Sequence, residues 1–214
     1  MNFAASTATS NYLTGYVLAG GGSTRFGQDK ALVEFGGKPM LARMVELLQG
    51  VTKEVRIIAA RGKYEMFGVK IVEDRWPGEG PLGGIITALE DAAGSAARAE
   101  WNLIVSCDMP FLTREWLTFL CDRAAKSKAQ VVLPHSGHGP EPLCACYRTA
   151  AAGALRAAFE SGVRKVTQGL QHVTTEVLDE VEWKRFDSAG RLFWNMNTQA
   201  DYEEASRGFK MGSA

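Results

Sequence analysis

Apolar and polar stretches alternate along the chain in a way that predicts strands and helices in turn. Residues 15–19, 54–60 and 101–107 are short, nearly continuous apolar runs, which are typical of strands buried on both faces of a sheet. Residues 40–48 instead carry apolar side chains at helical spacing, as expected of a helix with one buried face. Further strands are predicted over 69–73, 130–133, 143–148 and 174–178, and further helices over 85–93, 113–126, 150–160, 165–170 and 201–206.

This order of elements predicts an α/β domain in three layers, with a mostly parallel, doubly wound sheet between helices. We expect one domain over residues 15–208, a disordered leader over 1–14 and a frayed tail over 209–214. Ligands of such sheets bind beyond the carboxyl ends of the strands. The loops of chemical interest, which all leave predicted strand ends, are 20–30, 74–84 and 108–112.

Composition excludes several classes of protein. Hydrophobic residues make up 46% of the chain, and 24 basic residues balance 24 acidic ones, which argues against a nucleic-acid binder. No apolar run is long enough for a membrane helix, and the N-terminus lacks the cationic and apolar parts of a secretory signal. The four cysteines form no C-x-x-C pair, so we expect neither zinc nor disulfides and place the protein in the reducing cytoplasm.

The glycine-rich segment 18–30 follows the first predicted strand and has the composition of a phosphate-binding loop. Gly20, Gly21 and Gly22 let the backbone turn sharply and direct N–H groups toward a ligand. Arg25 supplies a planar, forked cation and Lys30 a compact one. A glycine-rich turn with two surface cations is the plainer reading, but the coincidence of these groups at a strand end favours an anion site.

Two common nucleotide-binding motifs do not match this segment. The dinucleotide fingerprint requires glycine at position 25, where the chain has Arg25. The P-loop requires Lys followed by Ser or Thr, where the chain has Gln28 and Asp29. An NAD-linked oxidoreductase and a P-loop NTPase are therefore both disfavoured.

Asp108 is the acidic residue best placed for metal chemistry. It follows an apolar strand and precedes Met109 and Pro110, so its carboxylate is expected at the carboxyl edge of the sheet. A lone Asp after a strand is most often a turn or cap residue. Cys107 beside it has no neighbouring His in sequence and is expected to be a buried structural thiol.

Five motifs, in order along the chain, resemble those of nucleotidyltransferases that use a nucleoside triphosphate, and most closely the molybdenum cofactor guanylyltransferases. They are L-A-G-G-x-S-x-R-F-G-x-D-K at 18–30, V-E-D at 72–74 with G-P-L-G-G at 80–84, C-D-M-P-F-L at 107–112, E-P-L at 141–143 and N-M-N-T at 195–198. The resemblance covers about residues 15–202. It implies the Rossmann-like fold of the nucleotide-diphospho-sugar transferases, with GTP and molybdopterin as substrates.

The resemblance also implies roles for individual residues. Arg25, Lys30 and Asp108 would be catalytic, and Asp108 would hold Mg²⁺. Asn197, or less favourably Asn195, would bind the metal or orient a group that does. The residues implied to bind nucleotide are Leu18, Ala19, Gly20, Gly21, Gly22, Arg25, Lys30, Asp74, Gly83 and Asp108.

The resemblance implies that the region around His135 and His138 lies near the second substrate, and a substrate-facing or surface loop is favoured over a metal-binding pair of histidines. The chain departs from the family pattern at residues 58–61, where an Asn is common and this sequence has I-A-A-R. Transient contact with other molybdenum cofactor proteins is a further expectation.

Two alternatives remain open at this stage. The first is a cytidylyltransferase acting on molybdopterin or another phosphorylated acceptor. Relatives that use cytidine resemble L-A-A-G, whose extra methyl would crowd a purine, whereas this chain has Gly20 and Gly21 after Ala19. The second is a nucleotide-binding regulator without catalysis on the same fold, against which the presence of Lys30 and Asp108 counts.

Overall fold

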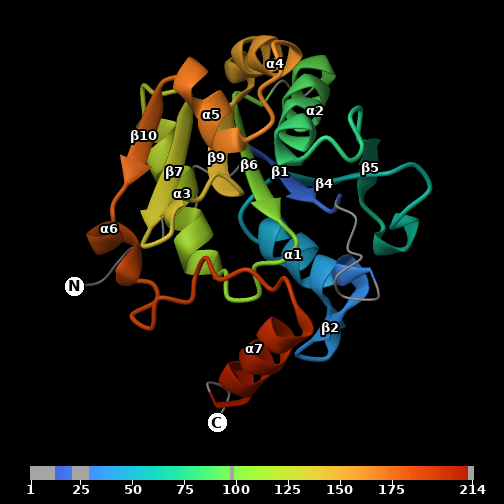
Figure 1. The fold of residues 1–214 in the computed structure, drawn as a ribbon, viewed down its shortest axis with the longest axis vertical. Coiled ribbons are helices and arrows are strands. Elements are labelled where there is room, and N and C mark those ends of the chain that lie inside the picture. The colour runs from blue at the N-terminus through green and yellow to red at the C-terminus, as the bar shows by residue number, and fades with distance from the viewer. Residues whose placement is uncertain (1–12, 21–28, 97–98, 212–214) are drawn as a thin grey trace.

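An eight-stranded sheet forms the middle layer of the protein, whose computed structural model describes residues 13–20, 29–96 and 99–211 (Figure 1). The strands follow the order β10-β7-β9-β6-β1-β4-β5, and β8 pairs with β7. Their bounds are β1 Leu13–Leu18, β4 Glu54–Ala59, β5 Lys70–Glu73, β6 Trp101–Ser106, β7 Val131–Ser136, β8 Gly139–Pro140, β9 Cys144–Arg148 and β10 Thr175–Leu178. The predicted three-layer α/β class with a mostly parallel sheet is thus confirmed.

Helices cover both faces of this sheet. They are α1 Met40–Gln49, α2 Pro81–Gly94, α3 Arg114–Lys126, α4 Ala152–Glu160, α5 Val166–Gly169, α6 Glu180–Lys184 and α7 Gln199–Met211, with short 3-10 turns at Lys30–Leu32, Glu65–Phe67, Thr149–Ala151 and Leu170–His172. One apolar cluster packs α1 and α3 against one face, and a second packs α2 and α4 against the other. Ile57 and Ile58 on β4 are both buried and belong to opposite clusters. Both faces are therefore core, which is why the strands are continuously apolar.

Strand β9 runs antiparallel to both of its neighbours in the sheet. It pairs antiparallel with both β6 and β7, whereas β1 pairs parallel with β4 and β6. Only residues 137–143 connect β7 to β9. A parallel crossover needs a dozen or more residues, so this connection is too short for one. The result is that the carboxyl ends of β1, β4, β5, β6 and β7 and the start of β9 meet at one edge of the sheet.

A small hairpin and the last helix form a separate unit beside that edge. The hairpin strands are β2 Glu34–Phe35 and β3 Lys38–Pro39. Phe35 and Met196 are buried together in a third apolar cluster, which also includes Ala205 of α7. Figure 1 shows α7 next to β2, away from the helices that cover the sheet. The segment before α7 is thereby held across the carboxyl ends of the strands.

A buried ionic network ties α2 to the sheet. Arg56 of β4 is 3% exposed and donates to Asp91 of α2 and to Glu54. The hydroxyl of Tyr16 donates to Asp91 at 2.9 Å, and Lys70 donates to the other oxygen of that carboxylate at 2.9 Å. Burial alone would raise the pKa of Asp91, but the hydrogen bonds from Lys70, Arg56 and Tyr16 hold it below its usual value.

Several predicted boundaries are wrong. Helix α2 begins at Pro81 rather than at residue 85, because Gly80 takes the positive φ that precedes the helix and Pro81 suits its first turn. Strand β1 begins two residues earlier than predicted, and α7 also begins two residues earlier. Helix α6 was not predicted, although Asp179 and Glu182 form a capping box at its start. In the part of the chain that the structure describes, each helix is too short or too polar to cross a bilayer.

Candidate active site

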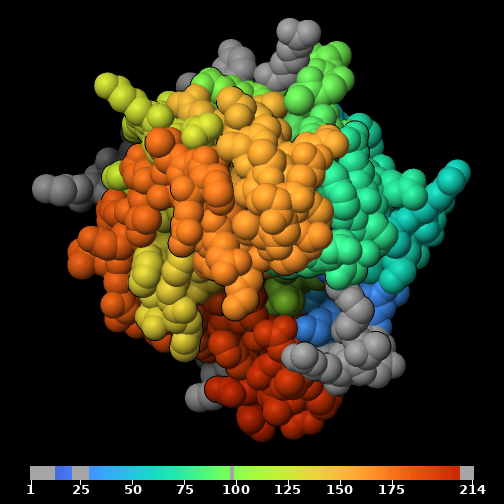
Figure 2. Space-filling view, turned by 45° about the horizontal axis from the view of Figure 1, so that its top comes forward, coloured from blue at the N-terminus to red at the C-terminus, as the bar shows by residue number. Residues whose placement is uncertain are grey.

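The predicted site residues that the structure describes lie at the carboxyl edge of the sheet. Gly20 follows β1, Asp74 follows β5 and Asp108 follows β6, while the segment 194–198 passes in front of them. Figure 2 shows a hollow between the red C-terminal segment and the orange residues above it, with green atoms at its bottom. Gly21, Gly22 and Arg25 fall outside the described residues, so their predicted roles remain predictions.

A small cavity of about 60 Å³ opens between β1, β5 and the start of α2. Its lining includes three of the predicted nucleotide-binding residues, Leu18, Gly20 and Asp74. The other lining residues, which the prediction did not include, are Ile58, Gly80, Pro81, Gly84, Ser106 and Leu143. The cavity therefore joins three of the five sequence motifs in one place.

Asp74 is oriented so that one carboxylate oxygen stays available to a ligand. Its Oδ1 accepts a hydrogen bond from the amide of Trp76 at 3.0 Å and faces the hydroxyl of Thr87 at 3.4 Å. Its Oδ2 lies 3.6 Å from the position that a Cβ on Gly20 would occupy. A carboxylate oxygen in this place can accept an N–H from a base or an O–H from a ribose. Glycine at position 20 leaves the approach open.

The two glycines in the first turn of α2 have different surroundings. A Cβ on Gly83 would lie 3.0 Å from the Cβ of Trp76, so this glycine permits close packing of the loop on the helix. A Cβ on Gly84 would lie 3.5 Å from Leu18, and Gly84 lines the small cavity. Gly83 is buried and does not line that cavity. Its predicted nucleotide contact is therefore untested, whereas its packing role is clear.

Lys30 is fixed at both its backbone and its side chain. It begins the 3-10 turn whose N-cap is Asp29, and the Asp29 side chain accepts from the amide of Ala31 at 3.2 Å. Its Nζ donates to Oδ1 of Asn197 at 2.8 Å, which joins residues 167 positions apart. The structure thus brings together the end of the glycine-rich segment and the N-M-N-T motif. Asn195, in contrast, donates its side-chain amide to the carbonyl of Phe193 at 3.2 Å.

One carboxylate oxygen of Asp108 is buried without a hydrogen-bond partner among the described residues. Its main-chain carbonyl accepts from the amide of Met196 at 2.9 Å, so the loop after β6 is tied to the N-M-N-T motif. Its Oδ1 is buried, and no residue that the structure describes donates a hydrogen bond to it. A buried acceptor without a partner costs free energy, so such an oxygen in a native fold needs an explanation. A bound cation would provide one.

The residues at Asp108 suit a hard divalent cation that is bound mainly by substrate. A carboxylate oxygen is the preferred ligand of Mg²⁺, which commonly takes one or two carboxylates together with phosphate oxygens and water. Among the described residues, no group of three or more His, Cys, Asp or Glu side chains could hold a metal. Asp108 is therefore not part of a complete protein cage, and a nucleotide would have to supply further ligands.

A second, larger cavity of about 520 Å³ opens on the other side of the segment 141–143. Glu141 lines it, whereas Leu143 lines the small cavity, so the E-P-L motif lies between the two. Its aromatic lining comes from Trp183, Phe193 and Trp194. The remaining lining residues include Ser136, His138, Glu180, Lys184 and Asn195.

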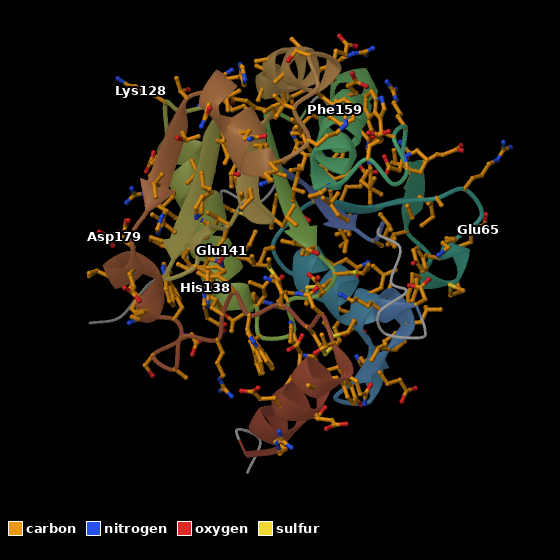
Figure 3. All side chains as sticks on the ribbon, viewed as in Figure 1. Glu65, Lys128, His138, Glu141, Phe159 and Asp179 are labelled. Atoms are coloured by element: carbon orange, nitrogen blue, oxygen red, sulfur yellow. The ribbon has the colours of Figure 1, made fainter. Side chains whose placement is uncertain are left out.

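Glu141 is the distinctive polar group of this larger cavity. Its Oε1 accepts a hydrogen bond from the hydroxyl of Ser136 at 2.6 Å, and Figure 3 shows it close to His138, which lines the same cavity. Burial raises the pKa of the Glu141 carboxyl, and the Ser136 hydrogen bond opposes this shift only in part. A half-buried carboxyl beside aromatic walls can recognise N–H donors on the edge of a flat ring.

The thiols of this region are not reactive groups. Cys107 is buried, as predicted, and burial strongly raises the pKa of its thiol. Cys144 and Cys146 are buried on one face of β9, and Trp116 donates its indole N–H to the sulfur of Cys144. A protonated, enclosed thiol is a poor nucleophile. The chemistry of the edge therefore rests on carboxylates, Lys30 and backbone groups.

The carboxyl edge of the mostly parallel sheet thus carries Gly20, Lys30 and Asp108, which are the kinds of group that a nucleotidyltransferase needs. The chain belongs to the MobA-like NTP transferase domain family, which it matches over residues 15–175. A probable molybdenum cofactor guanylyltransferase from Deinococcus radiodurans is 34% identical over 196 residues, covering 91% of this chain and 94% of that protein. A second, from Pelotomaculum thermopropionicum, is 32% identical over 193 residues, which cover 90% of this chain and 91% of that protein.

Solved structures agree with this assignment. The molybdopterin-guanine dinucleotide biosynthesis protein A from Archaeoglobus fulgidus has a TM-score of 0.79 and 25% identity, covering 92% of this chain and 99% of that one. A 2-C-methyl-D-erythritol 4-phosphate cytidylyltransferase from Thermus thermophilus has a TM-score of 0.66 at 14% identity, covering 91% and 98%. This second likeness concerns the fold alone. The site is therefore interpreted as that of a nucleotidyltransferase related to the molybdenum cofactor guanylyltransferases.

Proposed function

We propose that this enzyme transfers GMP from GTP to the terminal phosphate of molybdopterin, forming molybdopterin guanine dinucleotide and releasing diphosphate. The observation that carries the proposal is the position of Asp108. It follows Ser106 of the small cavity by two residues, and its carbonyl is bonded to the residue after Asn195 of the larger cavity. In this proposal, a metal ion at its buried Oδ1 would lie between a ligand in one cavity and a ligand in the other. The names of the curated relatives supply the identities of the two substrates.

The small cavity suits the nucleoside end of GTP. Leu18 and Ile58 offer apolar surface to a base, and the Oδ2 of Asp74, which has no hydrogen bond to any described residue, lies beside Gly20 at the same cavity. Guanine presents two adjacent N–H donors that a carboxylate can accept, whereas cytosine presents one amino group on its pairing edge. Gly20 in place of a larger residue leaves room for the purine. GTP rather than CTP is therefore the proposed donor.

The triphosphate lies next to Lys30 and Asp108 in this proposal. Mg²⁺, held by Asp108 and by phosphate oxygens, would neutralise charge on the triphosphate and on the departing diphosphate. Lys30 exchanges its hydrogen bond with Asn197 for one with a phosphate oxygen, or keeps it and adds a second, because an ammonium has three donors. Arg25 and the amides of Gly21 and Gly22 are proposed to bind the same phosphates, in keeping with the matched motif.

The larger cavity suits the acceptor. A volume of about 520 Å³ fits a flat ring system, and the aromatic side chains of Phe193 and Trp194 provide stacking surface. A pterin ring carries an amino group next to a ring N–H, which is the donor pair that the Glu141 carboxylate can accept. The pterin would then point its phosphate toward Asp108, past the segment 141–143 that separates the two cavities.

The reaction needs little acid–base chemistry from the protein. An oxygen of the acceptor phosphate forms a bond to the α-phosphorus of GTP, and the bond from that phosphorus to the bridging oxygen of diphosphate breaks. A phosphate monoester has a second pKa of about 6, so the attacking oxygen is already an anion at neutral pH. Alignment of the two substrates and neutralisation of charge are the contributions expected of the chain. A buried Cys107 and an unpaired Asp108 are consistent with that division.

A nucleotide panel tests the proposal. Diphosphate release would be measured with GTP, CTP and ATP, each with and without molybdopterin and at saturating Mg²⁺. We expect release that requires both GTP and molybdopterin, with CTP and ATP at least tenfold slower. Faster turnover of CTP would make the protein a cytidylyltransferase. Tight GTP binding without diphosphate release would make it a nucleotide-binding regulator.

A further inference from the structure

Tyr64 occupies a backbone conformation that disfavours its own side chain. Its φ is 63°, and it is the one non-glycine residue with a positive φ among those that the structure describes. This left-handed region is unfavourable for a bulky residue, and glycine or asparagine would adopt it at lower cost. The side chain is nonetheless 4% exposed and packed in the core. A strained residue that is also buried indicates that its side chain is needed where it is.

The Tyr64 hydroxyl reaches one residue near each end of the glycine-rich segment, Ala19 and Asp29. It lies 2.9 Å and 2.8 Å from the two carboxylate oxygens of Asp29, and 3.4 Å from the carbonyl oxygen of Ala19. A hydroxyl has one proton to donate, and the shorter distances indicate that Tyr64 donates it in a hydrogen bond to the Asp29 carboxylate. Ala19 and Asp29 are ten positions apart, and Tyr64, in the connection between β4 and β5, contacts the backbone carbonyl of the first and the carboxylate of the second.

Asp29 connects Tyr64 to Lys30, because it caps the 3-10 turn that begins at Lys30. The Asp29 carboxylate also accepts the amide of Ala31 and so caps the 3-10 turn that begins at Lys30. Burial alone would raise the pKa of Asp29, but the hydrogen bonds from Tyr64, Lys63 and Ala31 hold it below its usual value. The carboxylate is therefore charged at neutral pH and keeps all three partners.

Lys63 and Tyr64 differ in how firmly each can hold the Asp29 carboxylate in place. The Lys63 ammonium, 3.0 Å from Asp29, belongs to a side chain that is 52% exposed, so solvent screens this ion pair. The Tyr64 side chain is buried, and its backbone lies in the connection between β4 and β5. Tyr64 is thus the rigid partner, and the contact chain runs from its hydroxyl through Asp29 to Lys30, whose Nζ reaches Asn197 at 2.8 Å.

We infer that Tyr64 is a positioning residue of this enzyme, which acts through Asp29 to hold Lys30 where the triphosphate binds. The inference rests on the proposed function in one respect, namely that Lys30 contacts phosphate. Tyr64 itself touches neither substrate. The alternative is that the Tyr64 side chain only stabilises the fold; its ring also packs near that of Phe67, with the ring centroids 6.3 Å apart.

Tyr16 provides a matched control for the substitution Tyr64→Phe. Its hydroxyl also donates to an aspartate, Asp91, at 2.9 Å, and its side chain is fully buried. It belongs to the ionic network between α2 and the sheet rather than to the carboxyl edge. Tyr16→Phe and Tyr64→Phe therefore delete the same atom from the same kind of contact at two places. A loss of stability common to both variants is a structural effect, and a kinetic loss confined to Tyr64→Phe is not.

The experiment measures thermal unfolding, GTP dissociation constants and steady-state kinetics for both variants. Tyr64→Phe is expected to lower kcat/KM for GTP about tenfold, the size of one hydrogen bond to a charged group, while Tyr16→Phe changes it less than twofold. The same substitution is then made in a Lys30→Ala protein. There it should change the GTP dissociation constant less than twofold, because a residue that acts through Lys30 has nothing left to position.

Two results would overturn the inference. One is equal kcat/KM for the Tyr64→Phe and Tyr16→Phe proteins, which would leave the Tyr64 hydroxyl with a folding role only. The other is an undiminished effect of Tyr64→Phe on GTP binding in the Lys30→Ala background. Failure of the proposed function is separately visible, because the unaltered enzyme would then release no diphosphate from GTP and molybdopterin.

Discussion

Replacing Asp108 should raise the stability of the metal-free protein while it abolishes activity. The Oδ1 of Asp108 is buried without a partner, and an unsatisfied buried polar group costs about 1–3 kcal/mol. Asp108→Ala removes that acceptor and keeps the Cβ, and the small void left by the carboxylate costs on the order of 1 kcal/mol. The expected net gain is about 1 kcal/mol in the free energy of unfolding, which corresponds to a rise in Tm of about 2–4 °C for a chain of this length.

Addition of Mg²⁺ and GTP should reverse this order. A ligand at 100 times its dissociation constant stabilises the folded state by about 2.7 kcal/mol. The unaltered protein should gain this amount, and Asp108→Ala should gain much less because its metal ligand is missing. Turnover by Asp108→Ala, and by the isosteric Asp108→Asn, should fall at least about 10²-fold, the scale of a lost electrostatic contact at a reacting phosphate.

Thermal unfolding in EDTA and in saturating Mg²⁺ with GTP measures both effects. Asp122→Ala on α3 is the control for the loss of a carboxylate elsewhere, and it should keep the full response to nucleotide. The reasoning is refuted if Asp108→Ala is less stable than the unaltered protein in EDTA. It is equally refuted if Mg²⁺ and GTP stabilise Asp108→Ala as much as the unaltered protein.

Four further predictions follow from named contacts. Lys30→Ala should lower the maximal single-turnover rate more than it weakens GTP binding, because the cation neutralises charge that develops on diphosphate; a change in the binding constant alone would make Lys30 a docking group. Asp74→Asn should weaken GTP binding about tenfold or more relative to ATP, as measured by titration, and an unchanged ratio would remove Asp74 from base recognition. Glu141→Gln should raise KM for molybdopterin and leave KM for GTP unchanged, and the reverse pattern would contradict the acceptor cavity. Asp91→Asn should lower the free energy of unfolding by about 3 kcal/mol at pH 7, since it leaves Arg56 buried with fewer partners. The pKa of Asp91 is depressed in the folded state, so this contribution is present above the unfolded pKa of about 3.9 and is lost as the pH falls through the folded value; urea titrations at pH 7 and pH 3 should show the difference shrink, and a constant difference would disprove the assignment.

The sequence is most informative where continuous apolar strands end in polar or glycine-rich loops. Gly20, Asp74 and Asp108 each follow such a strand, and the parallel order of β1, β5 and β6 brings them to one edge as predicted. Local signals also explain some errors after the fact. Gly80 and Pro81 mark the true start of α2, but a loop rich in these residues obscured it.

Other features could not be predicted because they depend on contacts distant in sequence. The hydrogen bond from Lys30 to Asn197 joins residues 167 positions apart, so no local sequence pattern predicts it. Tyr64 lies in a stretch without clear periodicity, and its left-handed backbone and its contact with Asp29 are apparent only in three dimensions. The strands β2 and β3 are two residues each, which is too short for an alternating pattern to be recognised.

The central claim is that the site moves a guanylyl group, and the fate of labelled phosphorus tests it most directly. GTP labelled at the α-phosphorus and GTP labelled at the γ-phosphorus would each be incubated with the enzyme, Mg²⁺ and molybdopterin. We expect the α label in a product with the mass expected for molybdopterin guanine dinucleotide, and the γ label only in diphosphate. Transfer of the γ label to molybdopterin, or release of GDP with inorganic phosphate, would contradict it.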